Sequence, residues 1–445
     1  MRAWRAGLPS RHAEPGNLSR RTVLGGFVAA GAYRYANAKP ITDTQPVETG
    51  LGPVYSSSGP NAELYGATDG FPVPDPALAR IQGNPFEPKY RVGAFSHFDE
   101  LFPTRSVSHA DTTWTFKREA ADIHYSYRGK QSSIAEYLSR NPVTGLLIAK
   151  DDRILAEHYQ YGRTDRDRLI SQSMVKSIVG MLIGIAVSEG AIKSVDDPAE
   201  TYVAGFKGTE YGKTPIRDLL HMSSGVEFGE ERNGGSDLNR LWHDMVARPS
   251  FGYGPPKGTI ESIVQFNHRI APPGAKYYYA SIEPDVLGIV HRYAVRQTLG
   301  DYLHDRIWEP IGAEADASWL LDAQDFEVAH FGFNAVLRDY ARLGRLLAHD
   351  GAWEGKQIIP TQWMLDATTV RSADSYLAPG NAMPTFGYGY LLWLLPGPRR
   401  QFAMVGALGQ RVCVDPAAKL VMVQTAIEDT PEAWDLWHVL AKQFG

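Results

Sequence analysis

Strand-like segments lie near the two ends of this chain, with a long helical region between them, and this order constrains the fold more than any other feature. Residues 190–350 read as helices joined by glycine- and proline-rich loops. The predicted segments on either side are the hairpin Thr144–Lys150 and Arg153–Gln160, the late strands Tyr388–Leu395, Arg411–Asp415 and Leu420–Thr425, and a closing amphipathic helix, Pro431–Phe444. The pattern predicts an α/β fold in which both chain ends form one antiparallel sheet flanked by helices, with a mainly helical insertion at about 190–350.

The N-terminus carries the features of an export signal. Arg20 and Arg21 form a twin-arginine pair, an apolar stretch follows at 25–32, and an A-x-A cleavage motif stands at 36–38. A disordered basic tail is the alternative, but the order of pair, apolar stretch and cleavage motif favours a signal peptide at 1–38. We therefore expect export to the periplasm or the extracellular space.

Composition excludes several classes of protein. The formal net charge of the 445 residues is −5 with no block of like charges, which argues against a nucleic-acid partner. The single Cys413 excludes an internal disulfide and zinc sites built from cysteines, and the histidines form no HExxH motif, so we predict no metal and no cofactor. No stretch after residue 38 approaches the ~18 apolar residues of a membrane span. We expect an irregular N-terminal extension at 39–120 and one domain at 121–445.

Ser173 and Lys176 are three residues apart at the start of the apolar, glycine-punctuated helix predicted at 178–190. Residues i and i+3 share one face of a helix, so the lysine can reach the serine hydroxyl. A serine is a poor nucleophile until a neighbour takes its proton, and apolar surroundings disfavour the charged form of a lysine that would act as that base. A capping serine beside a lysine that extends to solvent is the structural alternative.

Two later segments carry further candidate residues. Tyr279 lies in a loop before a helix-like run, and its hydroxyl can relay a proton beside a serine–lysine pair; packing of an aromatic cluster is the alternative. Gly409 and Gln410 precede the predicted strand RVCVD, where a glycine allows close approach to a substrate and the Gln410 N–H can face its carbonyl oxygen. Alone, this second segment is an ordinary turn.

Taken in order, these segments resemble the serine β-lactamase and penicillin-binding-protein superfamily over roughly residues 130–445. Within it the chain is most similar to the 6-aminohexanoate-dimer hydrolases and related esterases. The segments that carry the resemblance are Arg91–Val107, Ser173–Ser177, Thr214–Gly225, Tyr277–Gly288 and Gly406–Pro416. It implies a β-lactamase-like fold with the site in a cleft between the sheet domain and an inserted helical domain.

The resemblance also implies roles for individual residues. Ser173 is then the nucleophile, Lys176 its base, and Tyr279 the tyrosine of a Y-x-S/N motif that ends at Ser281. The N–H groups of Ser173 and Gln410 would form the oxyanion hole, with Gly409 and Leu408 beside the substrate.

The chain departs from its relatives at the substrate-facing turn. Ala407-Leu408-Gly409 stands where β-lactamases have Lys-Thr-Gly, and Leu408 stands where the nylon-oligomer hydrolases have a histidine. Arg232 lies close to the place of a tyrosine with which those hydrolases hold the amide. Without the lysine, the turn offers no cation to a substrate carboxylate. We therefore expect a small neutral ester or amide as the substrate.

The sequence also allows functions other than ester or amide hydrolysis. A β-lactamase or D,D-peptidase is the nearest one, and an inactive binding protein on the same fold is the alternative from another class. No Gly-x-Ser-x-Gly motif supports an α/β-hydrolase. The oligomeric state is not predicted.

Overall fold

The computed structural model describes residues 52–76, 84–231, 236–246 and 255–445. These residues fall within the unit Glu48–Gly445. The signal peptide predicted at 1–38 lies outside the described residues. Across the described ranges, no helix is both long enough and apolar enough to cross a membrane.

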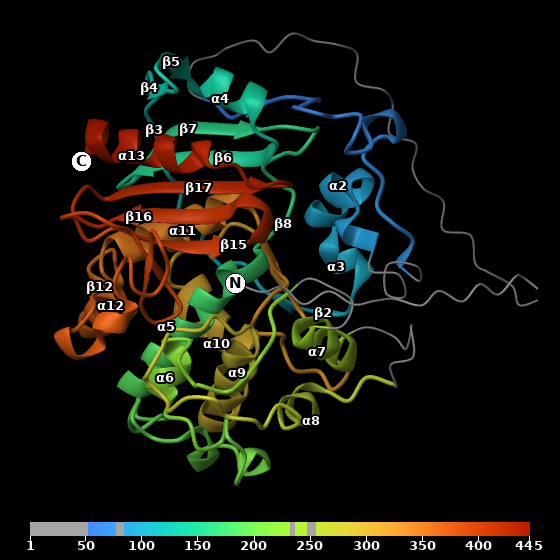
Figure 1. Ribbon diagram of the computed structural model, residues 1–445. Coiled ribbons are helices and arrows are strands. Elements are labelled where there is room, and N and C mark those ends of the chain that lie inside the picture. The colour runs from blue at the N-terminus through green and yellow to red at the C-terminus, as the bar shows by residue number, and fades with distance from the viewer. Residues whose placement is uncertain (1–51, 77–83, 232–235, 247–254) are drawn as a thin grey trace, which may run out of the picture. The chain divides into compact units, whose positions relative to one another are not determined.

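A nine-stranded sheet is the centre of the fold (Figure 1). Its strands, in the order in which they lie side by side, are β1 (Val54–Tyr55), β7 (Arg153–Tyr159), β6 (Val143–Lys150), β17 (Leu420–Ala426), β16 (Gln410–Asp415), β15 (Phe402–Gly406), β14 (Trp393–Leu394) and β13 (Gly387–Tyr388), with β3 (Lys117–Arg118) also paired to β7. The two chain ends meet where β17 pairs antiparallel with β6, in a register that aligns Leu420 with Lys150. The predicted hairpin and the predicted joining of both chain ends are therefore confirmed.

Helices cover both faces of this sheet and fill the middle of the chain. They are α2 (Arg91–Ser96), α3 (Phe98–Leu101), α4 (Ile134–Arg140), α5 (Val175–Ser188), α6 (Ile216–Leu220), α7 (Asp237–Met245), α8 (Thr259–Ile263), α9 (Ile282–Val295), α10 (Leu299–Leu303), α11 (Leu337–Ala348), α12 (Thr361–Thr368) and α13 (Glu432–Phe444). Short helical turns are η1 (Ala67–Asp69), η2 (Asn84–Phe86), η3 (Pro88–Tyr90), η5 (Ala199–Thr201), η6 (Ala204–Phe206), η7 (His304–Trp308) and η8 (Ser372–Leu377). In Figure 1, α5, α6, α9 and α10 gather below the main sheet.

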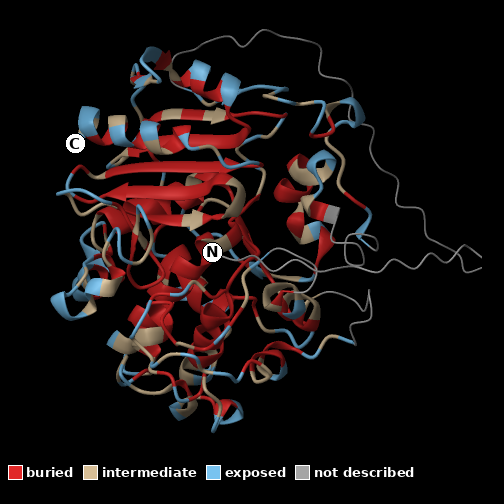
Figure 2. Cartoon of the chain, viewed as in Figure 1, coloured by how far each residue is buried: buried red, intermediate tan, exposed pale blue. Residues whose placement is uncertain are grey.

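Alternate residues of the central strands pack on opposite faces. Leu146 and Ile148 of β6 belong to the core cluster that includes Trp437 of α13. Leu147 and Ala149 belong to the larger cluster that includes the apolar side chains of α11 and α5. Because side chains along a strand point alternately to the two faces, a strand that is apolar throughout must be covered on both. Figure 2 shows the resulting buried strands beneath helices that keep an exposed outer face.

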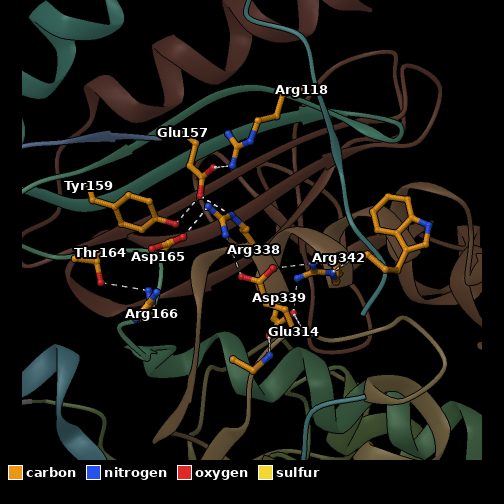
Figure 3. A network of polar contacts seen from close by, with 12 residues as sticks. Arg118, Glu157, Tyr159, Thr164, Asp165, Arg166, Glu314, Arg338, Asp339 and Arg342 are labelled. Atoms are coloured by element: carbon orange, nitrogen blue, oxygen red, sulfur yellow. Dashed lines mark hydrogen bonds and ion pairs between the residues drawn. The ribbon is translucent and has the colours of Figure 1, made fainter. Parts of the chain in front are cut away.

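The described part of the extension predicted at 39–120 is joined to the rest of the chain by paired strands and by charged side chains. The strands β1 and β3 pair in parallel with β7, so the sheet is mixed at this edge. Figure 3 shows the adjoining polar network, in which the buried carboxylate of Glu157 contacts both Arg118 of β3 and Arg338 of α11. One turn along α11, Arg342 donates to the carbonyl of Trp114 and pairs with Asp339 at 2.7 Å. These contacts fasten the extension to α11.

A second, four-stranded sheet lies in the order β2 (Thr104–Val107), β9 (Ala317–Leu320), β10 (Phe333–Ala335), β8 (Leu169–Ile170). The strands β9 and β10 fall inside the stretch predicted as mainly helical, so that prediction missed them. Two small hairpins complete the fold: β4 (His124–Tyr127) with β5 (Lys130–Ser133), and β11 (Ala352–Trp353) with β12 (Lys356–Gln357). The second sheet matters for the site because β8 leads directly into the segment that carries Ser173.

The strand predicted at 388–395 is wrong: this segment is a tight hairpin in which Tyr388 of β13 pairs with Trp393 of β14. Leu391 has a φ of 54° and forms the turn. Hydrogen bonds to neighbouring helices hold that turn, because Ser177 Oγ donates to the Leu391 carbonyl at 2.6 Å and Leu391 N–H donates to the Leu220 carbonyl at 2.9 Å. A Cβ on Gly389 would lie 1.8 Å from the Ala367 carbonyl oxygen, which explains the glycine.

Candidate active site

Ser173 lies where β8 passes into α5, in the 3₁₀ turn η4 (Gln172–Met174). Ser171 N–H donates to the carbonyl of Phe333 on β10 at 2.7 Å, which fixes the approach to the turn. Gln172 has a φ of 47°, so the chain bends sharply just before Ser173. The half-buried Ser173 therefore stands at the start of a buried helix, as predicted.

Lys176 Nζ is the centre of the candidate site. It lies 2.8 Å from Ser173 Oγ, 2.6 Å from the Tyr279 hydroxyl and 3.1 Å from Ser281 Oγ. Lys176 is only 2% exposed, so it does not extend to solvent as the structural alternative required. Its three contacts equal the number of protons on an ammonium group. The structure thus brings together Ser173, Lys176, Tyr279 and Ser281.

The three consecutive tyrosines occupy three different environments. Tyr277 is buried and its hydroxyl lies 3.7 Å from the Met383 sulfur, whereas Tyr278 is exposed. Tyr279 turns towards Lys176, whose Nζ lies 4.6 Å from the ring centroid, and packs near Tyr388 and Trp393. Backbone bonds hold the loop, since Tyr278 N–H donates to the Met222 carbonyl at 2.7 Å. Packing accounts for Tyr277, and Tyr279 alone reaches the lysine.

The turn between β15 and β16 is the 3₁₀ segment η9 (Ala407–Gly409), in which Leu408 and Gly409 have φ values of 61° and 91°. A Cβ on Gly406 would lie 2.4 Å from the Ser171 carbonyl oxygen, so glycine permits the close approach of β15 to the Ser173 segment. The Gln410 side chain turns into the protein and hydrogen-bonds to both backbone groups of Ala426. Any contribution of Gln410 to the site therefore comes from its backbone N–H.

Glu230 was not predicted as a site residue. Its two carboxylate oxygens accept from Ser281, one from the backbone N–H and the other from Oγ at 3.1 Å. Ser281 stands at the N-terminal cap position of α9, where a carboxylate also meets the positive end of the helix dipole. Glu230 and Ser281 are 51 positions apart in the sequence, which explains why no local pattern indicates the contact.

A second carboxylate lies deeper in the same region. Glu283, on the first turn of α9, is 1% exposed and accepts from Ser224 N–H at 3.3 Å. Burial raises the pKa of Glu283 well above its ordinary value, because the charged form is poorly solvated there. Burial also raises the pKa of the nearby Asp218 to about 6. Glu283 therefore favours its neutral form, and Asp218 is about half protonated near pH 6.

The described residues contain no group of three or more His, Cys, Asp or Glu side chains that could hold a metal ion. Cys413, the single cysteine, is fully buried in the main sheet. The polar side chains of the candidate site are those around Lys176.

The family model described as Beta-lactamase matches residues 133–436, which include every candidate site residue. The chain belongs to the beta-lactamase family. As predicted from the sequence, it is a serine hydrolase with a β-lactamase-like fold.

Relatives of this beta-lactamase-family chain include a 6-aminohexanoate-dimer hydrolase from Paenarthrobacter ureafaciens, with 24% identity over 78% of this chain and 88% of the relative. Among solved structures, a provisionally named 6-aminohexanoate-dimer hydrolase from Bacillus anthracis superposes with a TM-score of 0.75 at 23% identity, covering 84% of this chain and 97% of that one. A family VIII carboxylesterase superposes with a TM-score of 0.53 at 15% identity, covering 68% and 93%. These structures support the fold.

Proposed function

We propose that this chain hydrolyses a small neutral ester or linear amide through an acyl-enzyme, with Ser173 as the nucleophile, Lys176 as its base and Tyr279 as the proton relay. The observation that carries the proposal is the position of Lys176 Nζ between the Ser173 and Tyr279 hydroxyls, at 2.8 and 2.6 Å. Both distances are within the range for direct proton transfer.

In the proposed reaction, the neutral amine of Lys176 takes the Ser173 proton while Oγ bonds to the substrate carbonyl carbon. The N–H groups of Ser173 and Gln410 stabilise the negative charge that forms on the carbonyl oxygen. When the leaving group departs, Tyr279 donates its proton to it and recovers one from the ammonium of Lys176. Water then attacks the acyl-enzyme with its proton passing to the same groups, which releases Ser173.

A neutral substrate is supported by the charges around the site. Ala407 leaves the turn η9 without a cation, and the next residue, Leu408, is apolar and partly buried. On the other side of Lys176, Tyr279 packs beside Tyr388 and Trp393. The charged group joined to Lys176 through Ser281 is the acidic Glu230. A substrate carboxylate would lose its hydration without gaining a partner at η9, which costs up to a few kcal/mol.

The test compares kcat/KM for p-nitrophenyl acetate, a short linear amide and a cephalosporin. We expect the ester to be the best substrate and the cephalosporin at least a hundredfold worse. Ala407→Lys should improve the cephalosporin relative to the ester, whereas Ala407→Met, of similar length without charge, should not. Equal kcat/KM for the ester and the cephalosporin in the wild type would favour a β-lactamase or D,D-peptidase. If none of the substrates is turned over, the result would favour a binding protein.

We also propose that residues 1–38 direct export of the chain. Arg20 and Arg21, the apolar stretch 25–32 and the motif at 36–38 support this proposal.

The relative named as a 6-aminohexanoate-dimer hydrolase supports the amide alternative, and the carboxylesterase supports the ester alternative. The panel of substrates distinguishes the two.

A further inference from the structure

We infer that Glu230 is a positioning residue, which sets the direction of the Ser281 hydroxyl and thereby keeps the lone pair of Lys176 free for the Ser173 proton. The inference rests on the proposed roles of Ser173 and Lys176. Three hydrogen bonds link these groups: Lys176 Nζ to Ser281 Oγ at 3.1 Å, Ser281 Oγ to one Glu230 oxygen at 3.1 Å, and Ser281 N–H to the other.

Counting protons at Nζ gives the reason. The amine form of lysine has two N–H donors and one lone pair, and three oxygen atoms surround it. If Ser173 is to donate to the lone pair, the oxygens of Tyr279 and Ser281 must both accept. The Ser281 hydroxyl can accept from Nζ only when its own proton points elsewhere. A carboxylate has no proton to offer, so Glu230 draws the Ser281 proton away from the lysine.

The backbone N–H of Ser281 makes this arrangement specific for a carboxylate. That N–H always donates, so the Glu230 oxygen opposite it must accept, and the second oxygen is left to face Ser281 Oγ. In a Glu230→Gln variant the amide oxygen would face the N–H and the amide NH₂ would face Oγ. The Ser281 hydroxyl would then turn its proton to Nζ and occupy the lone pair.

The segment that carries Glu230 is held in place independently of Ser281. Gly229 N–H donates to the Asp237 carboxylate at 2.8 Å, and Leu238 N–H donates to the Gly229 carbonyl at 3.0 Å. Both partners lie on the first turn of α7, so Glu230 is presented from a fixed backbone. An amide at position 230 should occupy the same place as the carboxylate.

The experiment measures kcat and KM for p-nitrophenyl acetate in four variants: Glu230→Gln, Glu231→Gln, Ser281→Ala and the double variant Glu230→Gln with Ser281→Ala. Glu231 is the matched control, because it is exposed and has no contact with Ser281 among those the structure shows. Melting temperatures are measured on the same preparations, and Ser173→Ala serves as the inactive reference.

We expect Glu230→Gln to lower kcat roughly 10- to 100-fold with little change in KM, as for loss of a hydrogen bond to a charged group. Glu231→Gln should match the wild type. Ser281→Ala should be milder than Glu230→Gln, since removing the hydroxyl leaves nothing to donate to Nζ. The double variant should therefore recover to the level of Ser281→Ala.

Additive losses in the double variant, or wild-type kcat in a folded Glu230→Gln, would overturn the inference. If Glu230→Gln does not fold, the activities of Ser281→Ala and Ser281→Thr are compared instead. Threonine keeps a hydroxyl that Glu230 can orient. The threonine variant should therefore be more active than the alanine variant only if the oriented hydroxyl assists the lysine. Failure of the proposed function would appear separately, as turnover by Ser173→Ala.

Discussion

Tyr279 is the residue at which a catalytic role and a packing role give opposite results. Its hydroxyl contacts Lys176 at 2.6 Å, while its ring packs beside Tyr388 and Trp393. Tyr279→Phe keeps the ring and removes the proton relay, so kcat/KM should fall roughly 10²- to 10⁴-fold with little change in melting temperature. The control is Tyr278→Phe, on the exposed neighbouring ring. Near-normal turnover by Tyr279→Phe would assign Tyr279 to packing.

Among individual residues, the sequence could identify those whose roles depend on local spacing. Ser173 and Lys176 share one helical face, so three positions of sequence fix their contact. Glu230 reaches Ser281 across a loop and two helices, and nothing within a short window of either residue indicates it. The Gln410 side chain hydrogen-bonds to the backbone of Ala426, and the role of the Gln410 backbone N–H in an oxyanion hole stays a prediction.

At the scale of elements, the close packing of β15 against the Ser173 segment is the contact on which the site depends. Gly406→Ala would place a Cβ 2.4 Å from the Ser171 carbonyl oxygen and force the two segments apart. A displacement of about 1 Å at a reacting group can lower the rate about 10²-fold. We expect kcat/KM to fall by that order, measured beside Gly52→Ala, whose Cβ would meet no atom within 4 Å. Equal activity of the two variants would contradict this account of the glycine.

Strand length decided which elements could be predicted. The strands β6, β7 and β17 extend over seven or eight residues, and each was predicted. The two-residue strands β13 and β14 were predicted as one long strand, because the run YGYLLWLL shows no break. The chain turns at Leu391, whose carbonyl accepts from Ser177 Oγ and whose N–H donates to the Leu220 carbonyl, and both partners are distant in sequence. Tertiary contacts of this kind override local pattern.

For the whole molecule, two buried histidines predict a stability that falls in acid. Burial lowers the pKa of His291 to about 3 and that of His221 to about 4. The unfolded chain binds protons at these residues near pH 6.5, while the folded chain does not, so their contribution is complete above pH 6.5 and is lost as pH falls towards 4. Each histidine can lower the free energy of unfolding by about 1.4 kcal/mol per pH unit in that range.

The measurement is the urea midpoint of unfolding between pH 7.5 and 4.5. His291 packs against Tyr302 and neither of its ring nitrogens has a hydrogen-bond partner in the described part of the chain. His291→Phe should therefore fold and show a shallower fall of the midpoint with decreasing pH than the wild type. Replacing the exposed His268 by Phe should leave the slope unchanged. Parallel curves for His291→Phe and the wild type would contradict the assignment.

The proposed export signal is tested on the full chain. If residues 1–38 act as a twin-arginine signal, replacing Arg20 and Arg21 together by lysine should stop the appearance of the chain in the periplasm of a bacterial host. N-terminal sequencing of the exported wild type should begin at Lys39. Export of the double-lysine variant at the wild-type level would contradict the twin-arginine assignment.

The central claim is that Lys176 activates Ser173 as the nucleophile, and labelling by a fluorophosphonate tests it most directly. Wild-type protein, Ser173→Ala and Lys176→Met are incubated with the probe, and the labelled peptide is identified by mass spectrometry. The account predicts one adduct on Ser173 in the wild type, none in Ser173→Ala, and at least a hundredfold slower labelling in folded Lys176→Met. An adduct on another residue, or labelling of Lys176→Met at the wild-type rate, would contradict it.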